Sequence, residues 1–137
     1  ILFVRGADVN VNGEITFAPA VRGRVFFMLM SEGDINISGS AVGDATPAAG
    51  TPDLEGVYFT EGSFNTGTAG ASEDYQLYVR GVVAANSFSL SRTLGGVVVA
   101  PDDNLYPAEV FELGTDQLLM YPVYLSLRTV SWSEVSP

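Results

Sequence analysis

The sequence predicts an all-β protein, folded as a right-handed parallel β-solenoid of about four coils with a C-terminal cap. Three observations lead to this fold class. A short apolar strand, a turn glycine and an alternating strand recur along the chain. The loops between them are rich in Gly, Ala and Pro. Before Pro101, Gly, Thr, Val, Asn and Phe prevail over the usual helix formers. An antiparallel β-sandwich or jelly roll is the alternative.

The repeated unit begins with the apolar segments at residues 2–5, 28–32, 57–61 and 77–80. Each segment is followed by a glycine, and these turn positions are Gly6, Gly33, Gly62 and Gly81. Their separations indicate a unit of roughly 20–30 residues with loops of variable length, which is typical of repeat architectures. We therefore expect these four glycines to occupy equivalent places in successive coils.

Asparagines recur at one place after the first three of these glycines, at Asn10, Asn36 and Asn65. Each lies in a segment where apolar and polar residues alternate, the pattern of a half-buried strand. Stacked asparagines can bond to one another from strand to strand. The sequence therefore predicts a ladder of these three side chains that joins coil to coil.

The dipeptide Asn12-Gly13 separates two alternating segments and is also a strong hairpin signal. A two-residue hairpin would place Val11 opposite Glu14, which mixes an apolar and a charged side chain on one face. A corner in a solenoid requires no such pairing, because each strand bonds to the coil above or below it. This mismatch favours the solenoid over the antiparallel alternative.

We expect a single domain in which residues 1–100 form the coils and residues 101–137 form the cap. The tail has helix-like spacing at residues 116–121, before Pro122, and an apolar series up to Val135. The last coil of a solenoid exposes its interior, so an atypical terminal segment is expected to cover it. Leu118, Leu119 and Trp132 are the predicted capping residues.

Composition excludes several classes of function. The chain has 137 residues and a formal net charge of −10, with no Cys and no His, and all of its basic residues are Arg. Such a charge disfavours nucleic acid as a partner. No apolar run approaches the ~20 residues of a membrane-spanning helix, so no membrane insertion is expected. Without Cys or His, thiolate catalysis and the usual zinc sites are excluded.

No catalytic residue, metal site or cofactor is predicted, although the question of an enzyme stays open. Serines lack a His or Lys to activate them. Asp8 and Asp34, at equivalent places in the repeat, indicate either a solvated corner or a cation site. Residues 102–104 (Asp-Asp-Asn) are predicted to form a turn. Arg5 and Arg80 are expected to pair with nearby acids such as Glu32 or Glu61, or with loop carbonyls.

Residues 54–137 resemble a known group of proteins. The segments that carry the resemblance are 56–60 (Gly-Val-Tyr-Phe-Thr), 77–84 (Leu-Tyr-Val-Arg-Gly-Val-Val-Ala), 88–95 (Phe-Ser-Leu-Ser-Arg-Thr-Leu-Gly), 107–111 (Pro-Ala-Glu-Val-Phe) and 132–137 (Trp-Ser-Glu-Val-Ser-Pro). They are similar to the C-terminal β-helical region of long uncharacterised exported or surface proteins of small-genome candidate-phylum bacteria. The chain departs from that pattern at residues 112–114, where an aromatic and a basic residue are expected. The resemblance implies a secreted or surface β-helix and transfers no catalytic residues.

These observations together predict a structural or adhesive extracellular module, part of a larger surface protein or filament. The strand-like residues Ile1–Val4 predict a partner at that edge, either further coils of the same protein or another copy. The alternative is a carbohydrate-binding or polysaccharide-processing β-helix. In a glycan-binding module, Tyr58, Tyr78 or Tyr106 would offer a stacking surface.

Overall fold

The structure is a computed structural model that describes residues 1–45, 50–67, 74–94 and 106–122. It confirms the prediction of an all-β fold. The strands are β1 (Leu2–Val4), β2 (Val9–Val11), β3 (Met28–Ser31), β4 (Ile35–Ile37), β5 (Leu54–Asn65), β6 (Leu77–Ser89) and β7 (Glu109–Leu113). The helices are a 3-10 turn, η1 (Pro19–Val21), and one short α-helix, α1 (Thr115–Leu119).

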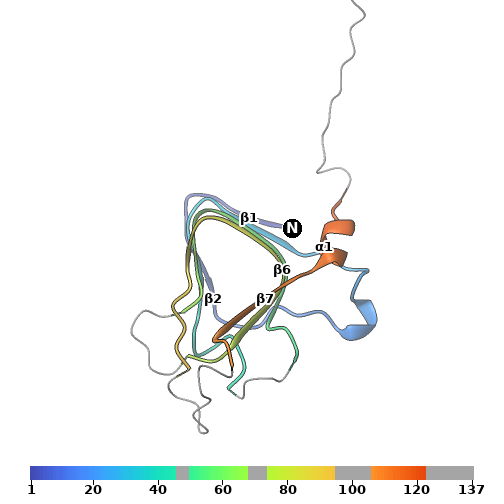
Figure 1. The fold of residues 1–137 in the computed structure, drawn as a ribbon. Coiled ribbons are helices and arrows are strands. Elements are labelled where there is room, and N and C mark those ends of the chain that lie inside the picture. Colours follow the sequence, from blue (N-terminus) through green and yellow to red (C-terminus); the bar gives the residue numbers. More distant parts are fainter. Residues whose placement is uncertain (46–49, 68–73, 95–105, 123–137) are drawn as a thin grey trace, which may run out of the picture.

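The strands form one strongly curled sheet in which every pairing between named strands is parallel. The antiparallel sandwich is therefore not the fold of the described residues. Figure 1 shows that the sheet bends at corners and gives a roughly triangular outline. Parallel strands need long connections, which the loops between β2 and β3 and between β4 and β5 supply.

The curled sheet has three flat walls, each with its own pairings. Wall A contains β1, β3 and residues 57–60 of β5 and 82–85 of β6. Wall B contains β2, β4 and residues 63–65 of β5 and 87–89 of β6. Wall C contains residues 54–56 of β5, residues 77–81 of β6, and β7. Strands β5 and β6 are long because each runs around the corners between walls.

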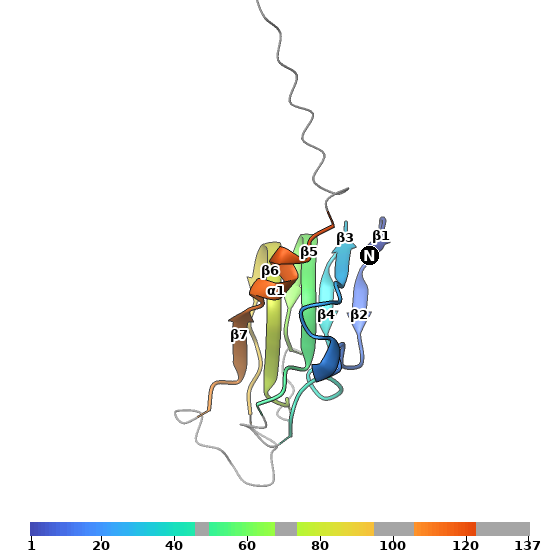
Figure 2. The same cartoon turned by 90° about the vertical axis from the view of Figure 1, so that its right-hand side faces the viewer.

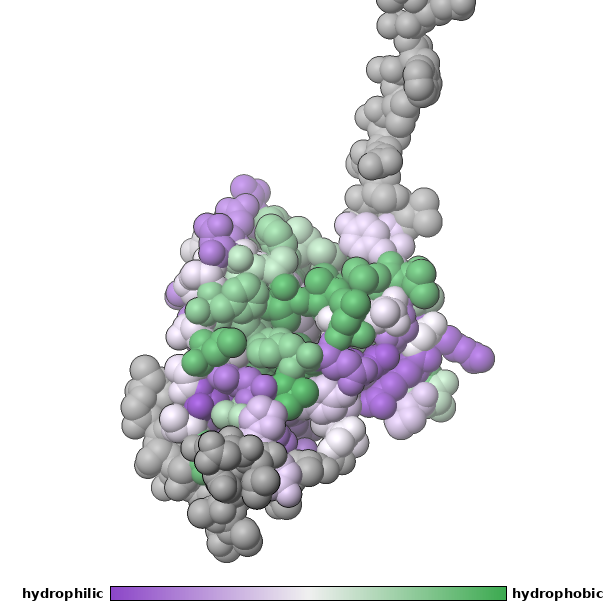
Figure 3. All heavy atoms as spheres, viewed as in Figure 1, coloured by the Kyte–Doolittle hydropathy of each residue, from purple (hydrophilic) through white to green (hydrophobic). Residues whose placement is uncertain are grey.

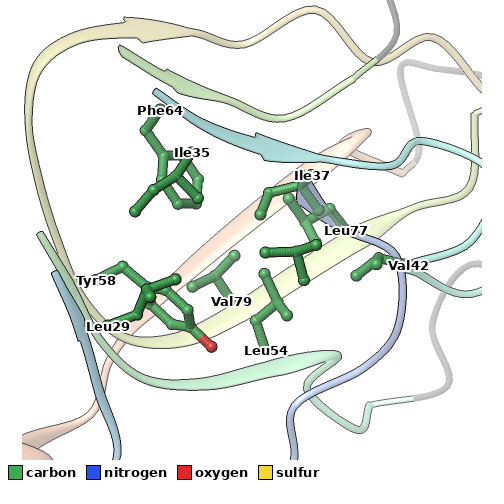
Figure 4. Packing of buried hydrophobic residues seen from close by; sticks show 10 residues of the cluster. Leu29, Ile35, Ile37, Val42, Leu54, Tyr58, Phe64, Leu77 and Val79 are labelled. Atoms are coloured by element: carbon green, nitrogen blue, oxygen red, sulfur yellow. The ribbon is translucent and has the colours of Figure 1, made fainter. Parts of the chain in front are cut away.

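Side chains that point into the triangle form the core, and the register stacks them in ladders. Leu29, Tyr58 and Val83 stack in wall A, because β3 pairs with β5 and β5 with β6 at these positions. The ladder in wall B is Ile35, Phe64 and Phe88, and the ladder in wall C is Leu54, Val79 and Phe111. The middle members are almost completely buried, and Figure 4 shows them meeting in the interior.

Gly33 and Gly62 lie at the corner between walls A and B, where the chain leaves no room for a side chain. A Cβ atom at Gly33 would lie 2.6 Å from the carbonyl oxygen of Ala7. A Cβ atom at Gly62 would lie 2.3 Å from Oδ1 of Asp34 and 3.0 Å from the carbonyl carbon of Gly33. Close stacking of one corner on the next thus explains why glycine recurs in the sequence at this corner.

Gly81 belongs to a different place in the fold, so the predicted equivalence of the four glycines holds only in part. The register pairs Gly81 with Gly56 and with Leu113 in wall C, while Gly6, Gly33 and Gly62 follow the strands of wall A. The strand segment at residues 77–81 resembles residues 2–6 in sequence. It nevertheless precedes the corner into wall A instead of following that wall.

The C-terminal helix packs on the outside of the walls and does not cover the end of the sheet. Figure 2 shows α1 beside β5 and β6. Its buried residue is Gln117, whose Nε2 donates to the carbonyl oxygen of Val25 at 3.2 Å. Leu118 and Leu119, predicted to cap the last coil, are 49% and 85% exposed. The third predicted capping residue, Trp132, lies outside the described residues.

The predicted boundary at residue 100 does not mark the end of the sheet. Strand β7 lies in the segment expected to form the cap, yet it pairs in parallel with β6 over residues 109–113. The segment after residue 100 therefore contributes a strand of wall C as well as α1.

Replacing Gly33 by Ala is expected to lower the free energy of unfolding by about 1–3 kcal/mol, the usual cost of overpacking. The added Cβ meets backbone atoms of Ala7, which cannot move without shifting the corner. Gly13→Ala is the matched control, because no heavy atom lies within 4 Å of its Cβ position. Denaturant unfolding of both variants measures the difference, and equal stabilities would contradict the close corner packing.

Candidate functional site

Both ends of the curled sheet expose large apolar side chains. At the first end, Ile1, Leu2 and Phe3 are each more than half exposed. Within the described part of the chain, β1 pairs only with β3 and β2 only with β4. One side of both strands therefore presents backbone N–H and C=O groups that no other described strand pairs with. Such edges are sites where another chain adds strands.

The opposite end is a shallow apolar hollow of about 420 Å³. Its lining includes Val83, Phe88, Leu90, Phe111 and Leu113. Figure 3 views this end and shows apolar side chains gathered across it, with polar residues at the rim. Val83, Phe88 and Phe111 are the last members of the three core ladders, and Phe88 and Phe111 are 50% and 44% exposed. The hollow is thus the uncovered interior of the sheet.

The predicted asparagine residues come together on the outer face of wall B. Strands β2, β4 and β5 align Asn10 with Asn36 and Asn36 with Asn65. The Nδ2 atom of Asn36 donates to Oδ1 of Asn10 at 3.4 Å, and that of Asn65 donates to Oδ1 of Asn36 at 2.7 Å. With Ser89 and Ser91 they line an open polar hollow of about 500 Å³.

Asp8 and Asp34 bind backbone groups of the neighbouring strand at the corner between walls A and B. Oδ1 of Asp8 accepts from the backbone N–H of Asp34 at 2.8 Å, and Oδ1 of Asp34 accepts from that of Ser63 at 2.7 Å. Each carboxylate therefore joins its own corner to the next one. Among the residues that the structure describes, no group of three or more acidic side chains could hold a metal ion. Residues 102–104 lie outside those residues.

Arg5 and Arg80 both form ion pairs, but in different places. Nε of Arg5 lies 3.2 Å from Oε1 of Glu32, as predicted from the sequence. Arg80 lies in wall C, where it reaches Asp116 at 2.7 Å and also approaches Glu55 and Glu112. Its hydrogen bond with Asp116 raises the pKa of Arg80 and lowers the pKa of the Asp116 carboxyl. This contact ties α1 to the outside of the sheet.

Arg92 is a buried residue that the sequence analysis did not identify. The residue is 5% exposed, and its guanidinium donates to the backbone carbonyl oxygens of Ser38, Val42, Thr66 and Tyr75. Burial lowers the pKa of Arg92, and the charge of Asp74 opposes that shift. Arg92 thus joins the segments that follow β4 and β5 to the segment that precedes β6. Its place in the series Ser-Arg-Thr-Leu gives no periodic signal, which is why sequence patterns did not indicate it.

Asp53 is the described carboxyl with the most perturbed acidity. It is 3% exposed, and its Oδ2 accepts from the backbone N–H of Tyr78 at 2.7 Å. Burial raises the pKa of Asp53 to about 6; the hydrogen bond from Tyr78 opposes the rise, and the charges of Asp44 and Glu14 add to it. The carboxyl is buried and accepts a backbone hydrogen bond. Its role in the fold is therefore to join the start of β5 to β6 in wall C.

The three tyrosines considered for glycan stacking differ in exposure. Tyr58 is completely buried in the core, so it cannot offer a binding surface. The hydroxyl of Tyr78 donates a hydrogen bond to Glu112, so this hydroxyl already has a partner within the chain. Tyr106 is 37% exposed. Of the three rings, Tyr106 is therefore the one with an exposed surface and no hydrogen bond or ring contact described above.

Comparison with models of protein families, with curated proteins and with solved structures gave no match. Among the described residues, no helix is long and apolar enough to cross a membrane.

Replacing Asp53 by Asn is expected to remove a pH-dependent loss of stability. Because its folded pKa lies above the unfolded value, the wild-type carboxyl binds a proton more tightly when folded. Wild-type stability therefore falls as the pH rises through the folded pKa of about 6. Between pH 5 and pH 7.5, Asp53→Asn should gain on the order of 1 kcal/mol relative to wild type. Urea unfolding at both values measures this, and a constant difference would refute it.

Proposed function

We propose that the curled sheet is a right-handed parallel β-solenoid of about four coils. In this proposal the chain serves as a rigid structural or adhesive module in a larger extracellular surface protein or filament. The observation that carries the proposal is the parallel stacking of strands in each wall, which ends in two uncovered apolar surfaces. Between β5 and β6 the register shifts once, at the corner between Thr60 and Ser63. A fold of this kind grows by adding coils, so its ends are natural points of connection.

The chemistry of the walls supports a scaffold. Polar ladders and corner contacts, such as Asn10–Asn36–Asn65 and Asp8–Asp34, connect each strand to its neighbour. Four of the described acidic residues form ion pairs with arginines, namely Glu32, Glu55, Glu112 and Asp116. These groups stabilise stacking and are not arranged around a reacting centre. The resemblance of residues 54–137 to exported surface proteins supports the extracellular location.

The proposed module contacts its neighbour through the Ile1–Val4 edge. Leu2 points into the triangle, because it pairs with the buried Leu29, yet it is 51% exposed. Covering it with further coils of the same protein, or with another copy, removes apolar area from water at roughly 25 cal/mol per Å². It also pairs the free backbone groups of β1 and β2.

A carbohydrate-binding role is the second candidate, and one observation favours it. The hollow on wall B presents amide and hydroxyl groups of Asn10, Asn36, Asn65 and Ser89 on a flat, open surface. Such groups form hydrogen bonds with sugar hydroxyls. Polysaccharide processing has less support, because the acids that the sequence singled out bind backbone groups at a corner.

Light scattering on the chain, over a range of concentrations, tests the connecting role of the Ile1–Val4 edge. The wild-type mass should rise above the 14.5 kDa of one chain as the concentration increases. Leu2→Glu places a charge on the exposed apolar edge and should hold the chain at that mass. Phe59→Glu is the matched control, since Phe59 is 39% exposed on the outside of wall A and lies in β5, which has a paired strand on both sides. A monomer for wild type and both variants would contradict the role.

A further inference from the structure

The two ends of the sheet are incomplete in complementary ways. At the C-terminal end, β7 pairs with β6 only over residues 109–113, in wall C. Residues 82–89 of β6, in walls A and B, pair with β5 on one side and with no other described strand. At the N-terminal end, the first strands, β1 and β2, lie in walls A and B. The last layer of described strands at the C-terminal end therefore has a strand in wall C but none in walls A and B. The first layer at the N-terminal end has its strands in walls A and B.

The path of the chain after β7 leaves that space open within the described residues. The backbone N–H of Gly114 donates to the carbonyl oxygen of Gly81 at 3.1 Å, which is the last contact along wall C. The chain then turns outward into α1, where Arg80 holds Asp116 and Gln117 reaches Val25. Helix α1 thus lies along the outside of the stack (Figure 2), and β5 is the only described strand that pairs with residues 82–85 of β6.

The registers inside the chain give the register that a second copy would adopt. Leu2 pairs with Leu29, Leu29 with Tyr58, and Tyr58 with Val83. The next place in this ladder, above Val83, is the one that Leu2 of a second copy would fill. In wall B, the ladder that starts at Val9 ends at Phe88. In wall C, the ladder that starts at Ile15 ends at Phe111.

We propose that a second copy of this chain docks end-on, with its β1 and β2 pairing in parallel with residues 82–89 of β6. The inference rests on the proposed stacking function and adds the receiving surface and the register. β7 of the first copy then completes one turn of the sheet together with β1 and β2 of the second. Apolar residues meet apolar residues in all three walls: Leu2 covers Val83, Val9 covers Phe88 and Ile15 covers Phe111.

The charge of the chain predicts how this contact responds to salt. Each copy carries a formal net charge of −10, so two copies repel one another. The facing ladders themselves are apolar, and burial of apolar area is not weakened by screening. Association should therefore strengthen between about 20 mM and 500 mM salt, because the Debye length falls from roughly 20 Å to about 4 Å. A contact made of ion pairs would show the opposite trend.

Disulfide trapping tests the register, since the natural chain has no Cys. Phe3 and Ala84 are exposed and point outward from wall A, and the proposed register places them opposite one another. Neighbouring strands lie about 4.8 Å apart, within the range of Cα separations that a disulfide spans. A mixture of the single variants Phe3→Cys and Ala84→Cys should give a heterodimer on oxidation. Ala20→Cys, on the exposed turn η1, replaces Ala84→Cys as the control and should give none.

Light scattering of Phe88→Glu separates this inference from the proposed function. The inference expects Phe88→Glu to lose association as fully as Leu2→Glu does, while Phe59→Glu associates like wild type. Circular dichroism verifies that the variants stay folded. Loss of association in Leu2→Glu alone, or cross-linked homodimers of Phe3→Cys alone, would overturn the receiving surface and leave the proposed edge role intact. A strict monomer for every protein, with no heterodimer, would overturn both.

Discussion

Backbone hydrogen bonding between parallel strands of successive units is the constraint on which the rest of this structure depends. Because each strand bonds to the equivalent strand of the next unit, every residue has its main neighbour about 4.8 Å away along the stack. This explains why identical or similar residues recur at fixed places: Asn on Asn in wall B, and apolar on apolar inside. It also explains the corner glycines, since Gly33 and Gly62 lie directly against the preceding corner. Asp8 and Asp34 also join successive corners, because their carboxylates accept hydrogen bonds from backbone N–H groups of the next corner.

The same constraint defines the surfaces that can carry function. Interior ladders are buried where a neighbour exists on both sides and exposed where one is missing, as at Leu2 and Phe88. The described chain begins in walls A and B and its sheet finishes in wall C. In the assembly that we propose, these two ends face one another in neighbouring copies. In that assembly, the formal net charge of −10 on each copy would oppose side-by-side contact, and the apolar ends would supply the contact between copies.

Much of the fold could be predicted from the sequence, because stacked strands place the same residue types at regular intervals along the chain. The Gly and Asn repeats predicted strands that pair in parallel across units, and the mismatch of Val11 with Glu14 correctly argued against a hairpin. The predicted alignment of the fourth unit with the first was wrong. Residues 77–81 resemble residues 2–6 in sequence, but they lie in wall C and pair with residues 54–56 and 109–113. Because loop lengths vary between units, sequence similarity between two segments did not show which wall each segment belongs to. The helix-like spacing at residues 116–121 did predict α1 (Thr115–Leu119), but it did not predict where the helix packs. The role of Arg92 and the packing of α1 could not be predicted, because each depends on contacts between distant segments that occur once.

The most direct test of this account is the register of the asparagine ladder in solution, measured by NMR. Parallel pairing at Asn10, Asn36 and Asn65 predicts inter-strand contacts between the backbone protons of β2 and β4 and of β4 and β5, together with side-chain amide contacts between successive asparagines. It also predicts slow amide exchange in β4, which has a paired strand on both sides. Cross-strand Hα–Hα contacts of the antiparallel kind, or contacts that join residues 77–81 to residues 2–6, would contradict the account.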